Sequence, residues 1–168
     1  MGKNKLEKTN VMRVLDQKKI PYQIYTYEEG SGPLGDHEYG LHVAQSIGKT
    51  PEMVFKTLVG RGASKGTYVF CIPVAESLDL KKTAKAVGEK SMELIAVKEI
   101  LDLTGYIRGG CSPVGMKKQY PTIFHESVLN CEQICVSAGK IGMQVELTPD
   151  ALLALVRGET ADIIVQES

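Results

Sequence analysis

Two apolar stretches joined by a short connection limit the folds that this chain can adopt. Residues 53–59 and 67–74 have the length and β-branched content of strands, and the seven residues between them include three glycines. Parallel strands need a crossover of roughly a dozen residues, so a connection of this length favours antiparallel neighbours. We therefore expect a β-hairpin near the centre of a sheet.

Helical and extended patterns alternate along the rest of the chain. Helices are expected at 10–18, 37–47, 80–87 and 97–104, with a last one starting at 148–150, and strands at 22–27, 122–125, 133–137 and 143–147. Glycines and Pro33 predict a loop at 28–36. Because several connections are hairpin-short, the pattern predicts one α+β domain over 1–168, with a mixed, mainly antiparallel sheet flanked by helices.

The charge balance excludes a strong general attraction to nucleic acid. Twenty basic and twenty acidic residues cancel, so binding to RNA would require a local basic patch. The chain has no apolar run long enough to span a bilayer and no export signal, so a cytoplasmic location is expected. Neither DNA nor a membrane is expected as a partner.

The chain offers little support for a metal or cofactor. Its four cysteines are expected to be reduced thiols, and no His or Cys pair near Cys131 and Cys135 completes a zinc site. Phosphate-binding and dinucleotide-binding glycine motifs are also missing. Its three histidines have no spacing that suggests a catalytic relay, although a triad is assembled in space.

Lys56 stands out because it lies inside the apolar strand V-F-K-T-L-V. On a strand, Val54, Lys56 and Leu58 would share one face, and a pocket with apolar walls could receive the lysine. The alternative is that Lys56 lies on an edge strand, where a lone lysine discourages aggregation. Strand periodicity alone does not separate the two.

The segment 104–118, T-G-Y-I-R-G-G-C-S-P-V-G-M-K-K, combines glycines with apolar residues. A linker would rarely carry Tyr106, Ile107, Val114 and Met116, which are expected to be buried. Glycine allows positive φ and lets backbone amides approach a ligand, so an anchored loop of this kind can bind one. A tight β-turn is the alternative.

Basic residues gather at two places, Lys81, Lys82 and Lys85 on one predicted helix and Lys117 and Lys118 after the glycine-rich loop. Residues 81 and 85 share a helix face, which can follow a nucleic-acid backbone. A solvated helix face is the commoner explanation of such a run.

Several segments together resemble the YbaK/EbsC family, the free-standing Cys-tRNA(Pro) deacylases. They are V-F-K-T-L-V, C-I-P-V-A-E-S-L-D-L-K-K-T-A-K-A-V-G and L-T-G-Y-I-R-G-G-C-S-P-V-G-M-K-K, with I-P-Y-Q-I-Y-T-Y near the start and V-S-A-G-K-I-G near the end. Their order and their spread over almost the whole chain make the resemblance far more specific than any single motif.

The resemblance implies a trans-editing enzyme that hydrolyses cysteine from proline tRNA mischarged by prolyl-tRNA synthetase. Its fold would be that of the synthetase's editing domain, with a curved mixed sheet, and the essential lysine falls on Lys56. The implied substrate pocket comprises Tyr27, Phe55, Thr57, Gly109, Gly110, Cys111, Ser112, Pro113, Ser137 and Gly139. The implied tRNA-binding residues are Lys81, Lys82, Lys85, Lys117 and Lys118.

In this family the substrate's own thiol is thought to attack the ester, so the enzyme would mainly position it and stabilise the oxyanion. Amides around Gly109 and Gly110 are candidates for holding the carbonyl or ribose, and Lys56 for binding phosphate or sugar oxygens. Cys111 stands where several relatives have no thiol, and we interpret it as a neighbour of the chemistry. Lys56 and the glycine-rich loop must then face one cavity.

Two alternatives remain open at this stage. The chain could edit another small amino acid, such as alanine, on proline tRNA, or it could be a non-catalytic module that binds tRNA or nucleotides. A free-standing editor of this size has no room for an anticodon-reading domain, so a transient complex with prolyl-tRNA synthetase is expected to supply tRNA specificity.

Overall fold

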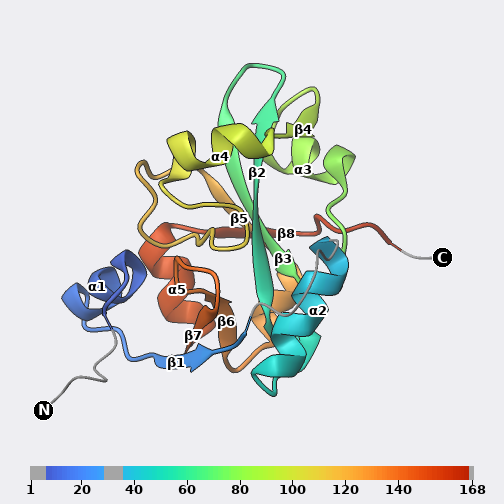
Figure 1. Ribbon diagram of the computed structural model, residues 1–168. Helices are drawn as coiled ribbons and strands as arrows, with labels where there is room; N and C mark the ends of the chain where they lie inside the picture. The colour runs from blue at the N-terminus through green and yellow to red at the C-terminus, as the bar shows by residue number, and fades with distance from the viewer. Residues whose placement is uncertain (1–6, 29–35, 167–168) are drawn as a thin grey trace, which may run out of the picture.

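The strands of the computed structural model, which describes residues 7–28 and 36–166, divide between two sheets (Figure 1). The larger has the order β4-β2-β3-β5-β8, with bounds Met92–Leu94 (β4), Phe55–Gly62 (β2), Thr67–Pro73 (β3), Thr122–His125 (β5) and Glu159–Ala161 (β8). The smaller has the order β1-β7-β6, with bounds Gln23–Thr26 (β1), Met143–Leu147 (β7) and Ile134–Ser137 (β6). An isolated parallel bridge between Val54 and Cys135 connects the sheets.

Helices lie around these sheets. Their bounds are Asn10–Gln17 (α1), Asp36–Ser46 (α2), Leu80–Val87 (α3), Val97–Thr104 (α4) and Pro149–Val156 (α5), with short 3₁₀ turns at Pro51–Met53 and Glu126–Asn130. Only the pairs β3–β5 and β5–β8 are parallel among the described strand pairs. The predicted α+β fold with mixed, mainly antiparallel pairing is confirmed, and its strands form two joined sheets instead of one. The predicted loop at 28–36 lies almost wholly outside the described residues.

The hairpin at the centre of the larger sheet is confirmed. β2 and β3 pair antiparallel with Lys56 opposite Ile72 and Val59 opposite Val69. The prediction ended β2 too early. Gly60 and Gly62 were expected in the turn, but both lie in the strand. There they pair with β4, and a Cβ atom on Gly62 would come within 2.3 Å of the Glu89 side chain.

Side chains cap three helices as local chemistry requires. Thr9 accepts a hydrogen bond from the Met12 amide, Asp79 from the Lys82 amide and Thr148 from the Ala151 amide. The predicted starts of these helices are therefore confirmed. Two strands, β4 and β8, were missed because each has three residues, too few to show a period of two.

The β2–β3 hairpin is covered on both faces. Phe55 and Val59 belong to a cluster that includes residues of α1, β6, β7 and α5, whereas Phe70 and Ile72 pack with residues of α3. Burial on both faces fixes the hairpin in place, so side chains at its start are held by a rigid element. No helix of the described part of the chain is long and apolar enough to cross a lipid bilayer.

Candidate active site

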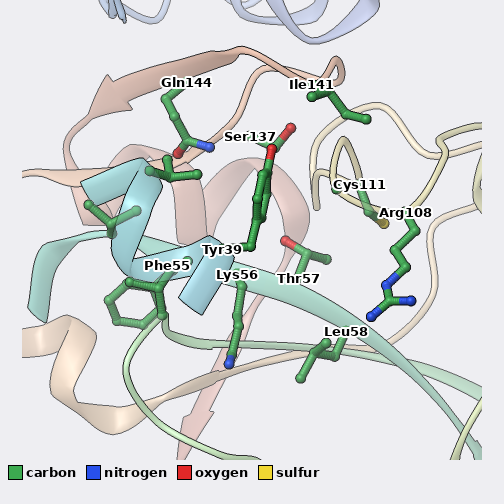
Figure 2. Close-up of a pocket in the computed structure, with 15 residues that line it drawn as sticks. Tyr39, Phe55, Lys56, Thr57, Leu58, Arg108, Cys111, Ser137, Ile141 and Gln144 are labelled. Carbon is green, nitrogen blue, oxygen red and sulfur yellow. The ribbon is translucent and has the colours of Figure 1, made fainter. Parts of the chain in front are cut away.

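A cavity of about 310 Å³ lies where α2, the start of β2 and the loops after α4 and β6 meet (Figure 2). Both sheets contribute to it, because Lys56 and Thr57 come from β2 whereas Ser137 and Gln144 come from β6 and β7. The residues that line it are Tyr39, Gly40, Val43, Val54, Phe55, Lys56, Thr57, Leu58, Val74, Arg108, Gly109, Cys111, Ser137, Ile141 and Gln144. The cavity therefore lies at the junction of the two sheets.

Charged and uncharged polar groups occupy opposite ends of this cavity. Figure 2 shows the Lys56 amine and the Arg108 guanidinium on the side away from Ser137 and Gln144. The alternation of β2 explains part of this arrangement, because Lys56 and Thr57 extend to opposite faces. Lys56 and Gly109 both line the cavity, but the Lys56 amine extends to the face of β2 opposite Thr57 and points away from Ser137. The cavity thus has a cationic end and an uncharged polar end.

A tight turn forms the wall that Gly109 contributes. The Gly110 amide donates to the Ile107 carbonyl at 2.9 Å, and Gly109 has φ of +89°, as the third residue of a type II turn requires. A Cβ atom on Gly110 would lie 3.2 Å from the backbone of Lys140 and Ile141. Both glycines are therefore needed for the turn and its packing. Because the Gly110 amide already donates within the turn, the role of amides around Gly109 and Gly110 in holding the substrate carbonyl or ribose stays a prediction.

Buried side chains anchor this loop. The Tyr106 hydroxyl donates to the Val114 carbonyl at 2.6 Å, and the Val114 amide donates to Ser112 Oγ at 3.3 Å. Tyr106 and Val114 are buried as expected, but the prediction for Ile107 was wrong, since 52% of its surface is exposed. These hydrogen bonds among buried residues fix the loop as one wall of the cavity.

Cys111 lines the cavity with an unreactive thiol. It is 9% exposed, and burial raises the pKa of its thiol to about 11. A thiol with this pKa is almost wholly protonated near neutrality, whereas the thiolate is the nucleophilic form. The geometry therefore supports the interpretation of Cys111 as a neighbour of the chemistry.

Replacing Cys111 by alanine is expected to leave the rate of ester cleavage within about threefold of the parent protein. The physical reason is that the protonated thiol contributes packing and no attacking sulfur. Steady-state deacylation measured beside Cys131→Ala, whose half-buried thiol lies outside the cavity, checks this result. Loss of activity in a folded Cys111→Ala protein, with Cys131→Ala unaffected, would contradict it.

The structure brings together five of the ten pocket residues named from the sequence: Phe55, Thr57, Gly109, Cys111 and Ser137. Tyr27 lies behind the wall, and its hydroxyl is 2.9 Å from that of Tyr39, which lines the cavity. Gly139 is also set back, with its amide donating to Ser137 Oγ at 3.1 Å. The other three, Gly110, Ser112 and Pro113, support the loop without lining the cavity.

Sequence reasoning missed nine lining residues, of which three lie on α2 and one on β7. Arg108 could have been found, since it is a lone cation between an apolar residue and two glycines in Y-I-R-G-G. Tyr39 and Gln144 carry no comparable pattern, because long-range packing brings them to the cavity. The missed residues are Tyr39, Gly40, Val43, Val54, Leu58, Val74, Arg108, Ile141 and Gln144.

The two basic clusters lie outside the cavity. Lys82 is held by Asp162 at 2.9 Å and by the Ile164 carbonyl at 2.8 Å, whereas Lys81 and Lys85 are exposed. Exposed Lys117 and Lys118 belong to the loop after α4, in a different part of the molecule from α3 (Figure 1). A role of these lysines in tRNA binding stays a prediction. Among the residues that the structure describes, no group of three His, Cys, Asp or Glu could hold a metal ion.

Comparison with known proteins places this site in a family. The family model described as the aminoacyl-tRNA editing domain matches residues 41–155, which include most of the cavity. The chain belongs to the aminoacyl-tRNA editing family. Its resemblance to the YbaK/EbsC proteins is thereby confirmed, and as an editing hydrolase it acts on mischarged tRNA.

Individual relatives of this editing domain agree with the assignment. The chain is 46% identical over 168 residues, covering 99% of this chain and all of the relative, to an Enterococcus faecalis V583 protein assigned as the Cys-tRNA(Pro)/Cys-tRNA(Cys) deacylase EbsC. A crystal structure assigned as a trans-editing enzyme for prolyl-tRNA synthetase superposes with a TM-score of 0.77 at 25% identity, covering 94% of this chain and 96% of that one. Hypothetical protein APE2540 shares the fold, with a TM-score of 0.81 at 18% identity over 94% and 100% of the chains.

Proposed function

We propose that residues 1–168 form one deacylase domain that hydrolyses the ester of cysteine mischarged onto proline tRNA. The observation that carries the proposal is a cavity with cations at one end, uncharged polar groups at the other and a protonated thiol in its wall. Such a cavity can bind an aminoacyl nucleotide without offering an ionised cysteine of its own. The names of the E. faecalis relative and of the trans-editing structure support the same reaction.

The cationic end binds the nucleotide part of the substrate. Lys56 and Arg108 supply the charges that phosphate and sugar oxygens prefer, and an arginine fork suits a phosphate particularly well. Val43, Val54 and Val74 form apolar walls that suit a small, uncharged side chain such as that of cysteine. Lys56 is thus a catalytic residue in the sense of substrate contact.

The reacting sulfur comes from the substrate. It bonds to the carbonyl carbon, the ester bond to the ribose oxygen breaks, and the thiol proton passes to that oxygen. Water then opens the resulting thiolactone, so cysteine and free tRNA are the products. An activated ester needs chiefly positioning and charge stabilisation, which a cavity without an ionised protein nucleophile provides.

Prolyl-tRNA synthetase supplies the specificity for the tRNA body in a transient complex. The cavity contacts only the end of the acceptor strand, and the basic residues Lys81, Lys82, Lys85, Lys117 and Lys118 are candidates for contact with the acceptor stem. The five lie on two separate parts of the surface, so contact with both clusters would need an extended ligand such as a stem.

A deacylation assay on three mischarged tRNAs, with and without prolyl-tRNA synthetase, tests the proposal. Cys-tRNA(Pro) is expected to lose cysteine, Ala-tRNA(Pro) to stay intact because it has no thiol, and Cys-tRNA(Cys) to be spared more strongly when the synthetase is present. Cleavage of Ala-tRNA(Pro) at a comparable rate would assign the enzyme to a different amino acid. Saturable tRNA binding without cleavage of any ester would instead assign a binding module.

A further inference from the structure

Gln144 and Ser137 form a cross-strand pair at the uncharged end of the cavity. They are directly opposite each other in the β6–β7 ladder, and both line the cavity. Directly opposite residues of antiparallel strands present their side chains on the same face, with Cβ atoms about 5 Å apart. The two polar side chains therefore reach one region of the cavity from neighbouring strands.

Gln144 is buried, and the two atoms of its side-chain amide differ in their surroundings. Its side chain belongs to a residue that is 6% exposed, and Oε1 is sealed from solvent with no partner among the described residues. Figure 2 shows the amide nitrogen directed toward Tyr39 and Ser137, into the cavity. The donor Nε2 is thus the amide atom that a ligand in the cavity can reach, whereas the sealed Oε1 is an acceptor and takes no part in this contact.

The Ser137 hydroxyl is able to donate a hydrogen bond to a ligand. Its oxygen accepts a hydrogen bond from the Gly139 amide at 3.1 Å, so the hydroxyl proton is not used in that contact. Ser137 is 7% exposed, and its hydroxyl lies with Gln144 at the end of the cavity opposite Lys56. This end thus offers an amide donor and a hydroxyl donor away from the cationic side chains.

We propose that Gln144 Nε2 and the Ser137 hydroxyl donate hydrogen bonds to the carbonyl oxygen of the aminoacyl ester. The inference rests on the proposed function and adds its oxyanion site. When sulfur attacks the carbonyl carbon, the carbonyl π electrons move to this oxygen, and the two donors stabilise the negative charge until the ester bond to ribose breaks. Gln144 is accordingly a catalytic residue of this reaction.

The structure favours this pair over the glycine turn as the oxyanion site. The Gly110 amide is already bonded to Ile107, so that turn cannot supply two adjacent free amides. The cationic end is also unsuited, because Lys56 and Arg108 there meet the phosphate side of the ligand. A nucleotide bound at the cationic end would direct its ester toward the opposite end, where Gln144 and Ser137 lie.

Gln144→Met tests the inference, because it keeps the length of the side chain and removes the donor. The kcat for Cys-tRNA(Pro) is expected to fall by about 100-fold with KM changed by less than about threefold, since the lost contact strengthens as charge develops. Thermal stability should stay equal or rise, because a buried side-chain oxygen without a partner is removed. Gln17→Met, at an exposed position on α1, is the matched control and should behave as the parent.

Binding of a non-cleavable substrate analogue gives a second readout that does not depend on turnover. An adenosine with cysteine joined by an amide at the 3′ position, labelled with ¹³C at the carbonyl, should show a larger shift of its carbonyl resonance on the parent protein than on Gln144→Met. Equal shifts, or a kcat within about threefold of the parent, would overturn the inference while leaving the proposed function in place. A parent protein that cleaves no ester would overturn both.

Discussion

Replacing Lys56 by alanine is expected to lower kcat/KM for Cys-tRNA(Pro) deacylation by about 1,000-fold. A charge-assisted hydrogen bond contributes roughly 1.5–3 kcal/mol, and two such contacts to phosphate and sugar oxygens account for a loss of this size. Lys56 lies at the start of a hairpin that is buried on both faces, so its position in the cavity wall is fixed. Single-turnover deacylation and thermal unfolding of the same preparations measure activity and fold separately.

Two further variants sharpen this result. Lys56→Arg keeps the charge and should lose less activity than the alanine variant, whereas Lys90→Ala removes an exposed lysine far from the cavity and should lose none. Full activity of a folded Lys56→Ala protein would show that the lysine serves the strand and not the substrate. That outcome would restore the alternative of a lysine that merely discourages aggregation.

Replacing Phe124 by alanine is expected to lower the free energy of unfolding by about 3–5 kcal/mol. The ring is fully buried on β5 and lies 6.5 Å, centroid to centroid, from that of Phe55, so its removal leaves a void in the largest core cluster. For a domain of this size such a loss corresponds to a fall in Tm of roughly 10 °C. Urea unfolding followed by circular dichroism gives the free energy directly.

Leu129→Ala is the matched control for this core variant. That leucine is 63% exposed, so its truncation should change stability by less than about 0.5 kcal/mol. Equal stabilities of the two variants would contradict the assignment of Phe124 to the core. Since Phe55 lines the cavity and is the neighbour of Phe124, the variant should also bind substrate less tightly under conditions where it is still folded.

Local patterns in the sequence were sufficient to predict the β2–β3 hairpin and to single out Lys56 as a candidate site residue. Strand periodicity and the short glycine-containing connection identify β2 and β3, and a lysine inside an apolar strand is visible without any structure. The helix starts at Thr9 and Asp79 were predictable because capping depends on residues three positions apart. All of these features depend on residues that are close together in the sequence.

The remaining site residues depend on contacts between distant segments. Gln144 lies in M-Q-V-E-L, where polar and apolar residues alternate, yet all five residues are buried in β7, the central strand between β1 and β6. Alternation would place Gln144 in solvent, whereas β6 pairing and α2 bring it to the cavity. Tyr27 shows the same dependence, since its hydroxyl is 2.9 Å from that of Tyr39, and of the two it is Tyr39 that lines the cavity.

The bridge between Val54 and Cys135 has a consequence for substrate length. Lys56 lies on the larger sheet and Arg108 on the loop after α4, whereas Gln144 and Ser137 lie on the smaller sheet. The distance between the two sheets therefore sets the distance between the proposed binding sites for phosphate and for the ester carbonyl. An aminoacyl group carried on a longer spacer than a ribose, such as a pantetheine thioester, could not occupy the phosphate site and the carbonyl site at the same time. Bulkier side chains at position 54 should therefore alter which acyl carriers are accepted before they alter which amino acids are.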